Sequence, residues 1–319
     1  MASQTDEVCQ QTVGTQSRRV SAFSARRFAD DAPGIHFYTG LENYEKCIGV
    51  LHTLGSAAHE LNCYHGVKPT LSIEDQFFTT LVKLRQHKTN VEMSRMFETS
   101  EATITNIFIT WINFMACQWG EINWWPSYDL IHFFSPTDFH QKFPSTRVII
   151  DGTEFPITRP MEPVAQQATF STYKNKNTVK VVVGTSPSGL VTYVSPAHGG
   201  SASDRQICER SSLSEMCEPG DSVMVDKGFN VQDLFENSMV SINIPTFFHK
   251  KNRLSGCAVM KDRKIASKRV HVERVIGLAK TYKILQHPMN NTESAMATQI
   301  VRVCFYLCNF RLCIVPKDA

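Results

Sequence analysis

The sequence lacks the features of membrane-bound and secreted proteins. Its 319 residues contain no apolar run of about 18, the length a helix needs to cross a bilayer. The opening segment, MASQTDEVCQQTVGTQSRRVSAFSARRF, contains no apolar core of a secretory signal. It is rich in Ser, Gln and Arg, a composition typical of disorder, so disorder is expected for residues 1–33. No membrane partner is expected.

Cysteine is present but lacks the spacing of metal or redox sites. None of the ten cysteines forms a CxxC pair, and none is followed by a His pair at zinc-finger spacing. Cys304, Cys308 and Cys313 lie in VCFYLCNFRLC, where the first two are one helical turn apart. We expect buried free thiols in a reducing compartment.

Positive charge is scarce overall but locally concentrated. The net charge is only +3, yet eleven Lys or Arg residues face two acidic residues between His249 and Lys283. Such a cluster is typical of a phosphate-binding surface, although a solvated helix face and a nuclear-localisation signal are alternatives. The candidate DNA-contacting residues are Lys227, Lys250, Lys251, Arg253, Lys264, Lys268, Arg269 and Arg274.

The amino-terminal part reads as helical. Apolar periodicity predicts a helix within 36–62, and Ser72 with Asp75 predicts a capping box at the start of a second helix. A short helix over 91–97, a tight turn and a longer helix over 101–115 follow. This order of elements is that of a helix-turn-helix unit.

The longer helix of this unit is poor in positive charge. Its sequence, SEATITNIFITWINF, contains no Lys or Arg, and acidic residues outnumber basic ones by one over residues 72–115. Because non-specific affinity for DNA comes mainly from basic residues on phosphates, two alternatives stay open. The unit is either a DNA reader or a three-helix packing module.

The carboxyl-terminal part reads as a mixed α/β domain. Residues 147–157 form the first expected strand, and TVKVVVGTSPSGLVTYVSP forms a hairpin that turns at Ser186–Gly189. Next we expect a helix entered at Ser203 or Asp204, a strand that ends at Asp226, a strand ended by Pro245, and a helix over 261–283. Hairpin strands followed by strands that alternate with helices predict a mixed sheet.

Three carboxylates stand at apolar positions of this domain. Asp151 interrupts the first strand, Asp226 follows Val-Met-Val in a later strand, and Glu273 lies between valines on a basic helix. Such a cluster repels itself unless cations neutralise it, and ligands with oxygen donors alone favour Mg²⁺ or Mn²⁺. We therefore expect divalent ions, and not an arginine, to meet Asp151. Glu154 falls on the opposite face of the strand, and Asp204 reads as an N-cap.

Each carboxylate has a structural alternative. Asp151 could pair with an arginine or cap a loop. Asp226 precedes Lys-Gly, a composition typical of turns. Glu273 could pair with Arg269, one helical turn earlier. The three residues together are more specific than any one of them.

Several segments, in order, resemble the DDE-type endonuclease domain of PIF/Harbinger-like transposases and of vertebrate genes domesticated from them. They read VIIDGTEFPITRP, STYKNKNTVKVVVGTSPSGLVTYVS, GGSASDRQI, PGDSVMVDKGF, INIPTF and KIASKRVHVERVIGLAK. The helix-turn-helix region and FYTGLENYE resemble the amino-terminal part of the same proteins, so the resemblance covers residues 36–315. It implies an RNase H-like fold in which Asp151, Asp226 and Glu273 are the DDE triad.

The resemblance also implies an activity. The triad would bind two divalent cations, Mg²⁺ or Mn²⁺, with Asp151 bridging both and Asp226 and Glu273 each holding mainly one. Water would hydrolyse DNA at transposon ends, and the freed 3′-hydroxyl would then attack target DNA. A host nuclease domesticated from such an enzyme would keep this chemistry. The alternative is a catalytically silent descendant that binds DNA or protein.

Partners and organisation follow from the same resemblance. The resemblance implies DNA and a separate Myb/SANT-like DNA-binding protein as partners. A homo-oligomer and a nuclear location, with a cytoplasmic pool, are further expectations. The chain departs from some relatives because it has no Cys/His set for an amino-terminal zinc module. The expected division is a disordered 1–33, a helical helix-turn-helix-like domain over 34–120, a connecting segment over 121–146 and an endonuclease domain over 147–319.

Overall fold

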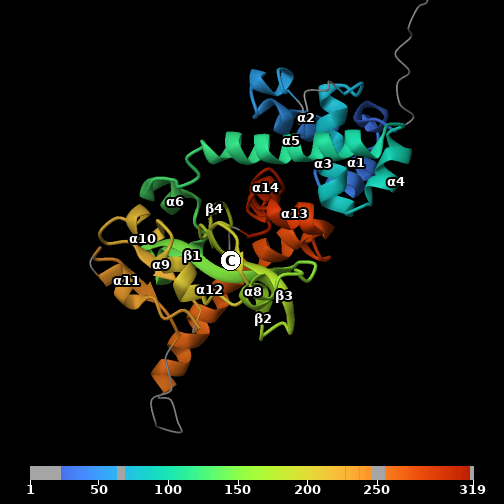
Figure 1. The fold of residues 1–319 in the computed structure, drawn as a ribbon. Coiled ribbons are helices and arrows are strands. Elements are labelled where there is room, and N and C mark those ends of the chain that lie inside the picture. Colours follow the sequence, from blue (N-terminus) through green and yellow to red (C-terminus); the bar gives the residue numbers. More distant parts are fainter. Residues whose placement is uncertain (1–22, 63–68, 227, 237, 246–255, 317–319) are drawn as a thin grey trace, which may run out of the picture.

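The computed structural model describes residues 23–62, 69–226, 228–236, 238–245 and 256–316. Figure 1 shows a group of helices from the amino-terminal part beside a twisted sheet with helices around it. No helix in these described ranges is both long enough and apolar enough to span a bilayer.

Two short helices and a 3₁₀ turn cover most of the range 36–62 that was predicted to be helical. The helices are α1 (Ala32–Thr39) and α2 (Tyr44–His52), followed by a 3₁₀ turn at Ser56–His59. Gly40 ends α1 in the left-handed region at φ 82°, where a glycine is favoured, and the side chain of Asn43 caps α2. The prediction of helical structure within 36–62 is therefore confirmed in part, since breaks at 40–43 and 53–55 separate three helical segments.

Part of the segment expected to be disordered packs against the helical core. A 3₁₀ turn spans Ala25–Phe28, and the ring of Phe23 lies 5.7 Å from that of Phe78 on α3. The N–H of Ala25 donates to the carboxylate of Asp75 at 3.0 Å. These contacts order the chain from residue 23 on, while residues 1–22 lie outside the described part.

The next three helices follow the predicted helix-turn-helix order. They are α3 (Ile73–Gln86), α4 (Asn90–Met96) and α5 (Glu101–Gly120), and their N-caps are Ser72, Thr89 and Ser100. Ser72 caps α3, but the carboxylate of Asp75 accepts its hydroxyl, so this pair is not the reciprocal capping box that was predicted. Thr89 and Glu92 form a complete capping box at the start of α4. The predicted order of helices is confirmed, and α5 runs past residue 115.

The carboxyl-terminal part is built on one mixed sheet. Its strands are β1 (Thr146–Pro156), β2 (Phe170–Ser171), β3 (Lys176–Thr185), β4 (Val191–Val194), β5 (His198–Gly199), β6 (Ser222–Met224) and β7 (Ser241–Asn243). β3 pairs antiparallel with β1, β2, β4 and β5, while β6 and β7 run parallel to β1 on its other side. The order β4–β3–β1–β6–β7 confirms the expected RNase H-like fold.

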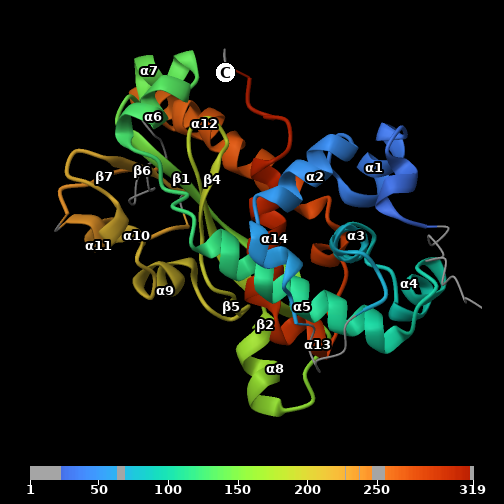
Figure 2. The same ribbon diagram turned by 90° about the horizontal axis from the view of Figure 1, so that it is seen from above.

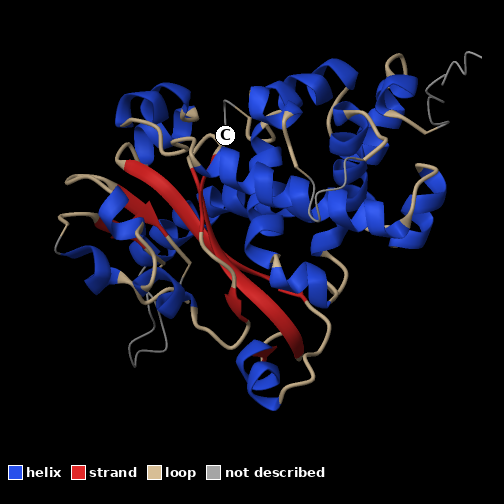
Figure 3. Ribbon diagram, turned by 45° about the horizontal axis from the view of Figure 1, so that its top comes forward, coloured by secondary structure: helices blue, strands red, loops and turns tan. Residues whose placement is uncertain are grey.

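Helices cover both faces of this sheet (Figure 3). They are α6 (Tyr128–Phe134), α7 (Thr137–Lys142), α8 (Pro163–Thr169), α9 (Asp204–Glu209), α10 (Leu213–Met216), α11 (Gln232–Glu236), α12 (Gly256–Lys280), α13 (Asn291–Ala295) and α14 (Ala297–Asn309), with a 3₁₀ turn at Lys283–Leu285. Alternate residues of β1 serve two cores: Ile149 packs with α12 and α14, and Ile150 packs with α9 and α11.

α14 joins the two parts of the chain. It packs against α5 from the helical part and against β4 and α12 from the sheet part, as Figure 2 shows. Cys304 and Cys308 on α14 are buried free thiols, as predicted, whereas Cys313, beyond the helix, is exposed. The helical part and the sheet therefore share one continuous hydrophobic core.

Candidate active site

Strand register brings two of the predicted carboxylates together. β1 and β6 are parallel, with Ile149 opposite Met224. Asp151 and Asp226 each follow two residues after this pair. Because side chains alternate along a strand, the two carboxylates therefore lie side by side on one face of the sheet. The N–H of Val225 donates to the carbonyl of Asn243 at 3.0 Å, which keeps the chain extended up to Asp226.

The third carboxylate comes from the helix that crosses this face. α12 packs on β1 and β3 through buried residues that include Val272 and Val275. Glu273 lies between them in sequence, and its side chain is 53% exposed. The helix thus carries Glu273 to the rim of the face that holds Asp151.

Arg269, one turn before Glu273 on α12, stands among the three carboxylates. Its Nη1 donates to Asp226 Oδ1 at 2.8 Å, and its Nη2 lies 3.7 Å from Asp151 Oδ1 and 3.8 Å from Glu273 Oε1. The prediction that no arginine meets Asp151 was therefore wrong. The structural alternative in which Glu273 pairs with Arg269 is also present in the structure.

The electrostatics of the cluster remain unbalanced. Burial raises the pKa of Asp151 to about 6, with further raising by Asp226 and Glu273, although Arg269 and the N–H of Gly152 oppose the shift. Three carboxylates share one guanidinium, whose Nε is buried and makes no hydrogen bond. In the described part of the site, negative charge therefore exceeds positive charge, which favours a further cation.

The donor set has the chemistry of a divalent-metal site. All three side chains offer carboxylate oxygens, the donors that Mg²⁺ and Mn²⁺ prefer. Among the described residues, no three Asp, Glu, His or Cys side chains are spaced to hold one ion. The guanidinium of Arg269 contacts one oxygen of each carboxylate. The residue types fit a divalent metal, which would compete with Arg269 for these oxygens.

The opposite face of β1 holds a separate charged group. Glu154 accepts from the hydroxyl of Thr178 at 2.9 Å and lies 3.4 Å from the ammonium of Lys180. Asp204 lies 3.6 Å from the same ammonium, and a side chain at Gly152 would collide with its carboxylate. Glu154 thus belongs to the other face, as its sequence position suggested.

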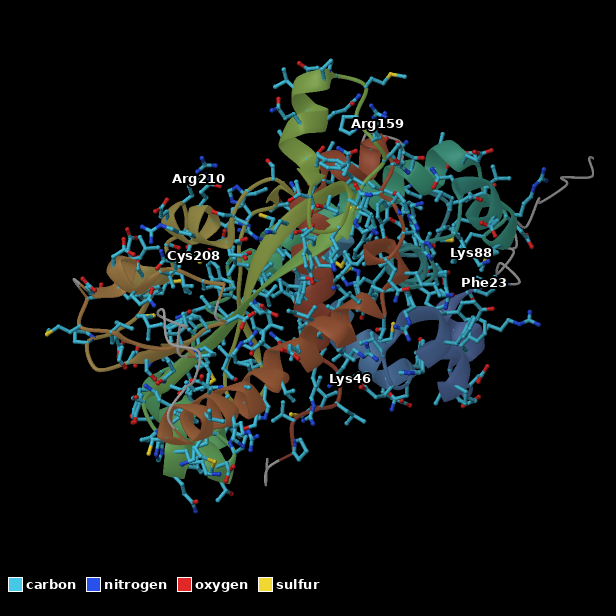
Figure 4. The ribbon with its side chains drawn as sticks, turned by 90° about the horizontal axis from the view of Figure 1, so that it is seen from below. Phe23, Lys46, Lys88, Arg159, Cys208 and Arg210 are labelled. Atoms are coloured by element: carbon cyan, nitrogen blue, oxygen red, sulfur yellow. The ribbon has the colours of Figure 1, made fainter. Side chains whose placement is uncertain are left out.

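Asp204 is not the cap of its helix. The N-cap of α9 is Ser203, which forms a capping box with Gln206, and Asp204 is the first helical residue. The expectation that Asp204 is an N-cap was therefore wrong. Figure 4 labels Cys208 and Arg210, which mark α9 and its carboxyl-terminal end.

The predicted DNA-contacting residues divide into three groups. Lys264 and Arg274 are exposed on α12. Lys268 is buried and pairs with Asp138 of α7 at 2.8 Å, and Arg269 is buried among the carboxylates, because α12 packs between α7 and the sheet. The remaining four, Lys227, Lys250, Lys251 and Arg253, lie outside the described residues.

Lys280 is a residue of the site that the candidate DNA contacts omitted. Burial lowers its pKa, and the charge of Lys174 lowers it further, while Asp151 and Glu154 oppose the shift. Its ammonium lies 5.8 Å from the centre of the Phe155 ring. The signal was available in the sequence, because residues seven apart lie on one face of a helix and Glu273 is seven residues earlier.

Comparison with known proteins agrees with this geometry. A family model described as DDE superfamily endonuclease matches residues 150–309, half of the chain, and includes all three carboxylates. A second model, described as the helix-turn-helix of DDE superfamily endonuclease, matches residues 69–120. No curated protein and no solved structure matches the chain. The chain belongs to the DDE superfamily endonucleases.

Proposed function

We propose that this DDE superfamily endonuclease is a metal-dependent DNA nuclease of the PIF/Harbinger transposase type. It would cut at transposon ends and transfer the freed strand, or act as a host nuclease domesticated from such an enzyme. The observation that carries the proposal is the approach of Asp151, Asp226 and Glu273 from three elements to one guanidinium. A cluster so rich in carboxylate repels itself and favours divalent cations.

The roles of the residues follow from the family resemblance. The three carboxylates would hold two ions, with Asp151 shared between them and Asp226 and Glu273 each holding mainly one. Bound Mg²⁺ or Mn²⁺ would activate water and stabilise charge on the attacking and leaving oxygens of a phosphodiester. Above pH 6, where the pKa of Asp151 lies, its carboxylate is in the ionised form that an ion requires.

Arg269 would act on the carboxylates and not on the leaving group. Its guanidinium offsets part of their repulsion and so holds them on one face of the sheet. Exposed cations on α12, Lys264 and Arg274, would contact DNA phosphates beside the site. The basic stretch from His249 to Lys283 would serve nuclear import as well, which supports a nuclear location.

A second candidate function is favoured by the same arginine. Arg269 pairs with all three carboxylates, so the fold does not need a metal ion to hold them together. A protein of this fold without catalytic activity could serve as a DNA- or protein-binding factor. A Myb/SANT-like partner and a homo-oligomer belong to either proposal, since both come from the family resemblance.

A cleavage assay separates the two functions. Purified protein is incubated with end-labelled duplexes and Mg²⁺ or Mn²⁺, beside Asp151→Asn and beside reactions with EDTA. The proposal expects metal-dependent cutting by the parent and none by the variant. Binding of DNA with no cutting of any duplex, flap or nicked substrate would establish the second function instead.

A further inference from the structure

The turn between β2 and β3, residues 172–175, is an exposed feature that the catalytic triad does not use. Every residue from Thr172 to Lys176 is exposed, and the side chain of Tyr173 is 84% exposed. The turn itself is well built: the buried hydroxyl of Ser171 accepts the N–H of Lys174 at 3.2 Å, and Asn175 adopts φ 52°. An aromatic ring is thus presented to solvent on an ordered support.

Positive charge accompanies this ring. The ammonium of Lys174 lies 4.8 Å from the centre of the Tyr173 ring, and Lys176 is the first residue of β3. Arg159 is also exposed at the foot of α8, where its guanidinium donates to Gln166 (Figure 4). An aromatic face beside cations is the combination that binds a nucleic-acid strand, with stacking on bases and pairing with phosphates.

The turn lies on a line that begins at the carboxylates. β3 runs antiparallel to β1, so the register leads from Asp151, opposite Val183, to Pro156, opposite Thr178, and then to the turn. Lys280 lies along this line, near Phe155, and the charges of both Asp151 and Lys174 act on it. α12 packs on β3, and β3 also contacts α8 and β2. Basic side chains, Lys280 and then Lys174, therefore lie along the line from the carboxylates to the turn.

We propose that the β2–β3 turn receives the DNA strand that extends from the scissile phosphate, with Tyr173 stacked on a base and Lys174 paired with a phosphate. This inference rests on the proposed function, because it takes the carboxylates as the place where the strand is cut. The path along β3 from Val183, opposite Asp151, to Lys176 at the edge of the turn is about 23 Å at the rise of a strand. At about 3.4 Å per nucleotide, it spans roughly seven nucleotides.

The length of the path gives a sharp test. Affinity is measured by fluorescence anisotropy with Asp151→Asn protein, so that the DNA stays intact. The probes are duplexes with a single-stranded flank of about two or about eight nucleotides on either side of the cleavage point. Tyr173→Ala is expected to weaken binding of the longer flank about tenfold and to leave the shorter one unchanged. Lys174→Ala is expected to reduce the salt dependence by about one phosphate contact.

Two matched variants control for general effects. Phe133→Ala removes another exposed ring, on α6, and Lys46→Ala removes an exposed lysine on α2, labelled in Figure 4. Both are expected to bind like the parent, and thermal melting checks that all four variants fold. Equal loss on short and long flanks, or no loss with Tyr173→Ala, would overturn the inference. So would a change of oligomeric state in Tyr173→Ala at unchanged DNA affinity, since the turn would then be a protein contact.

The cleavage assay is independent of this binding test. If the parent cuts no substrate but Tyr173→Ala still loses affinity only for long flanks, the strand path is supported and the nuclease proposal fails. If the parent cuts and Tyr173→Ala binds every probe normally, the nuclease proposal is supported and the strand path is wrong.

Discussion

Two groups of paired charges lie in different regions of the molecule and differ in their ratio of acidic to basic side chains. At the contact between α3 and α13, Glu293 lies 3.5 Å from the ammonium of Lys83 and 3.3 Å from Nε2 of His87. On the sheet, by contrast, three carboxylates share the guanidinium of Arg269. Among the contacts of the described residues, the first group has two basic side chains against one carboxylate, and the second has one basic side chain against three carboxylates.

The groups also differ in access to water. Only 3% of the Glu293 side chain is exposed, and its carboxylate also accepts the N–H of Asn290 at 3.0 Å. The side chains of Asp226 and Glu273 are about half exposed, at 46% and 53%. A closed and fully paired group is what structural stability requires, whereas an open group with excess negative charge is what a metal and a substrate require.

The largest effect should come from removing a carboxylate of the open group. Glu273→Gln is expected to lower cutting about a thousandfold, since bound metal contributes several kcal/mol of transition-state stabilisation. The melting temperature should stay level or rise, because one of three repelling charges is gone. Cleavage rates and thermal melting of the same preparation measure both quantities.

A matched carboxylate on the other face of β1 provides the control. Glu154→Gln removes the partner of Lys180 and should lower the melting temperature while the folded protein still cuts. If Glu273→Gln and Glu154→Gln affected cutting equally, the division of the two faces would be wrong.

The next effect is on the closed group. Glu293→Ala leaves the ammonium of Lys83 buried without its carboxylate and should cost about 3 kcal/mol of unfolding free energy. Denaturant unfolding followed by fluorescence measures this loss. Cutting by the folded fraction should be unchanged, because Glu293 belongs to the contact with the helical part. Normal stability of Glu293→Ala together with impaired cutting would show that the closed group serves catalysis and not stability.

Removing the cation of the open group, Arg269, is the third test. Arg269→Gln removes the cation that offsets the carboxylates and should lower the free energy of unfolding by about 2 kcal/mol without metal. Mn²⁺ should then stabilise the variant more than the parent, because no guanidinium competes for the oxygens. Lys264→Gln, exposed on the same helix, is the matched control. An equal Mn²⁺ shift in parent and variant would show that Arg269 does not compete with metal.

Local signals predicted much of the fold. The alternation of β1, the hairpin turn before β4 and the Ser72 cap of α3 depend on neighbours in sequence, and all are present. The convergence of Asp151 with Asp226 was also predictable, because both follow apolar strand residues, and parallel strands align such positions. Propensity and periodicity suffice where a feature depends on nearby residues.

Long-range packing could not be predicted in the same way. Periodicity gave α5 as a helix but not its burial against α14, whose sequence lies nearly two hundred residues away. Lys268 and Arg269 read as surface cations, yet α7 and the sheet bury them. Which way a basic side chain points on α12 depends on tertiary contacts, and the sequence pattern does not contain these contacts.

The smallest effect should be a pH dependence of the closed group. Burial opposes ionisation of Glu293, but the hydrogen bond with His87, the charge of Lys83 and the N–H of Asn290 outweigh it, so the pKa of Glu293 is lowered. A carboxyl group with a lowered folded pKa contributes stability above its unfolded value of 4.5 and loses it as the pH falls through the folded value. The difference in melting temperature between the parent and Glu293→Gln should therefore be full at neutral pH and shrink in acid. A difference that stays constant from neutral pH down to strong acid would show that the carboxylate charge does not stabilise this contact.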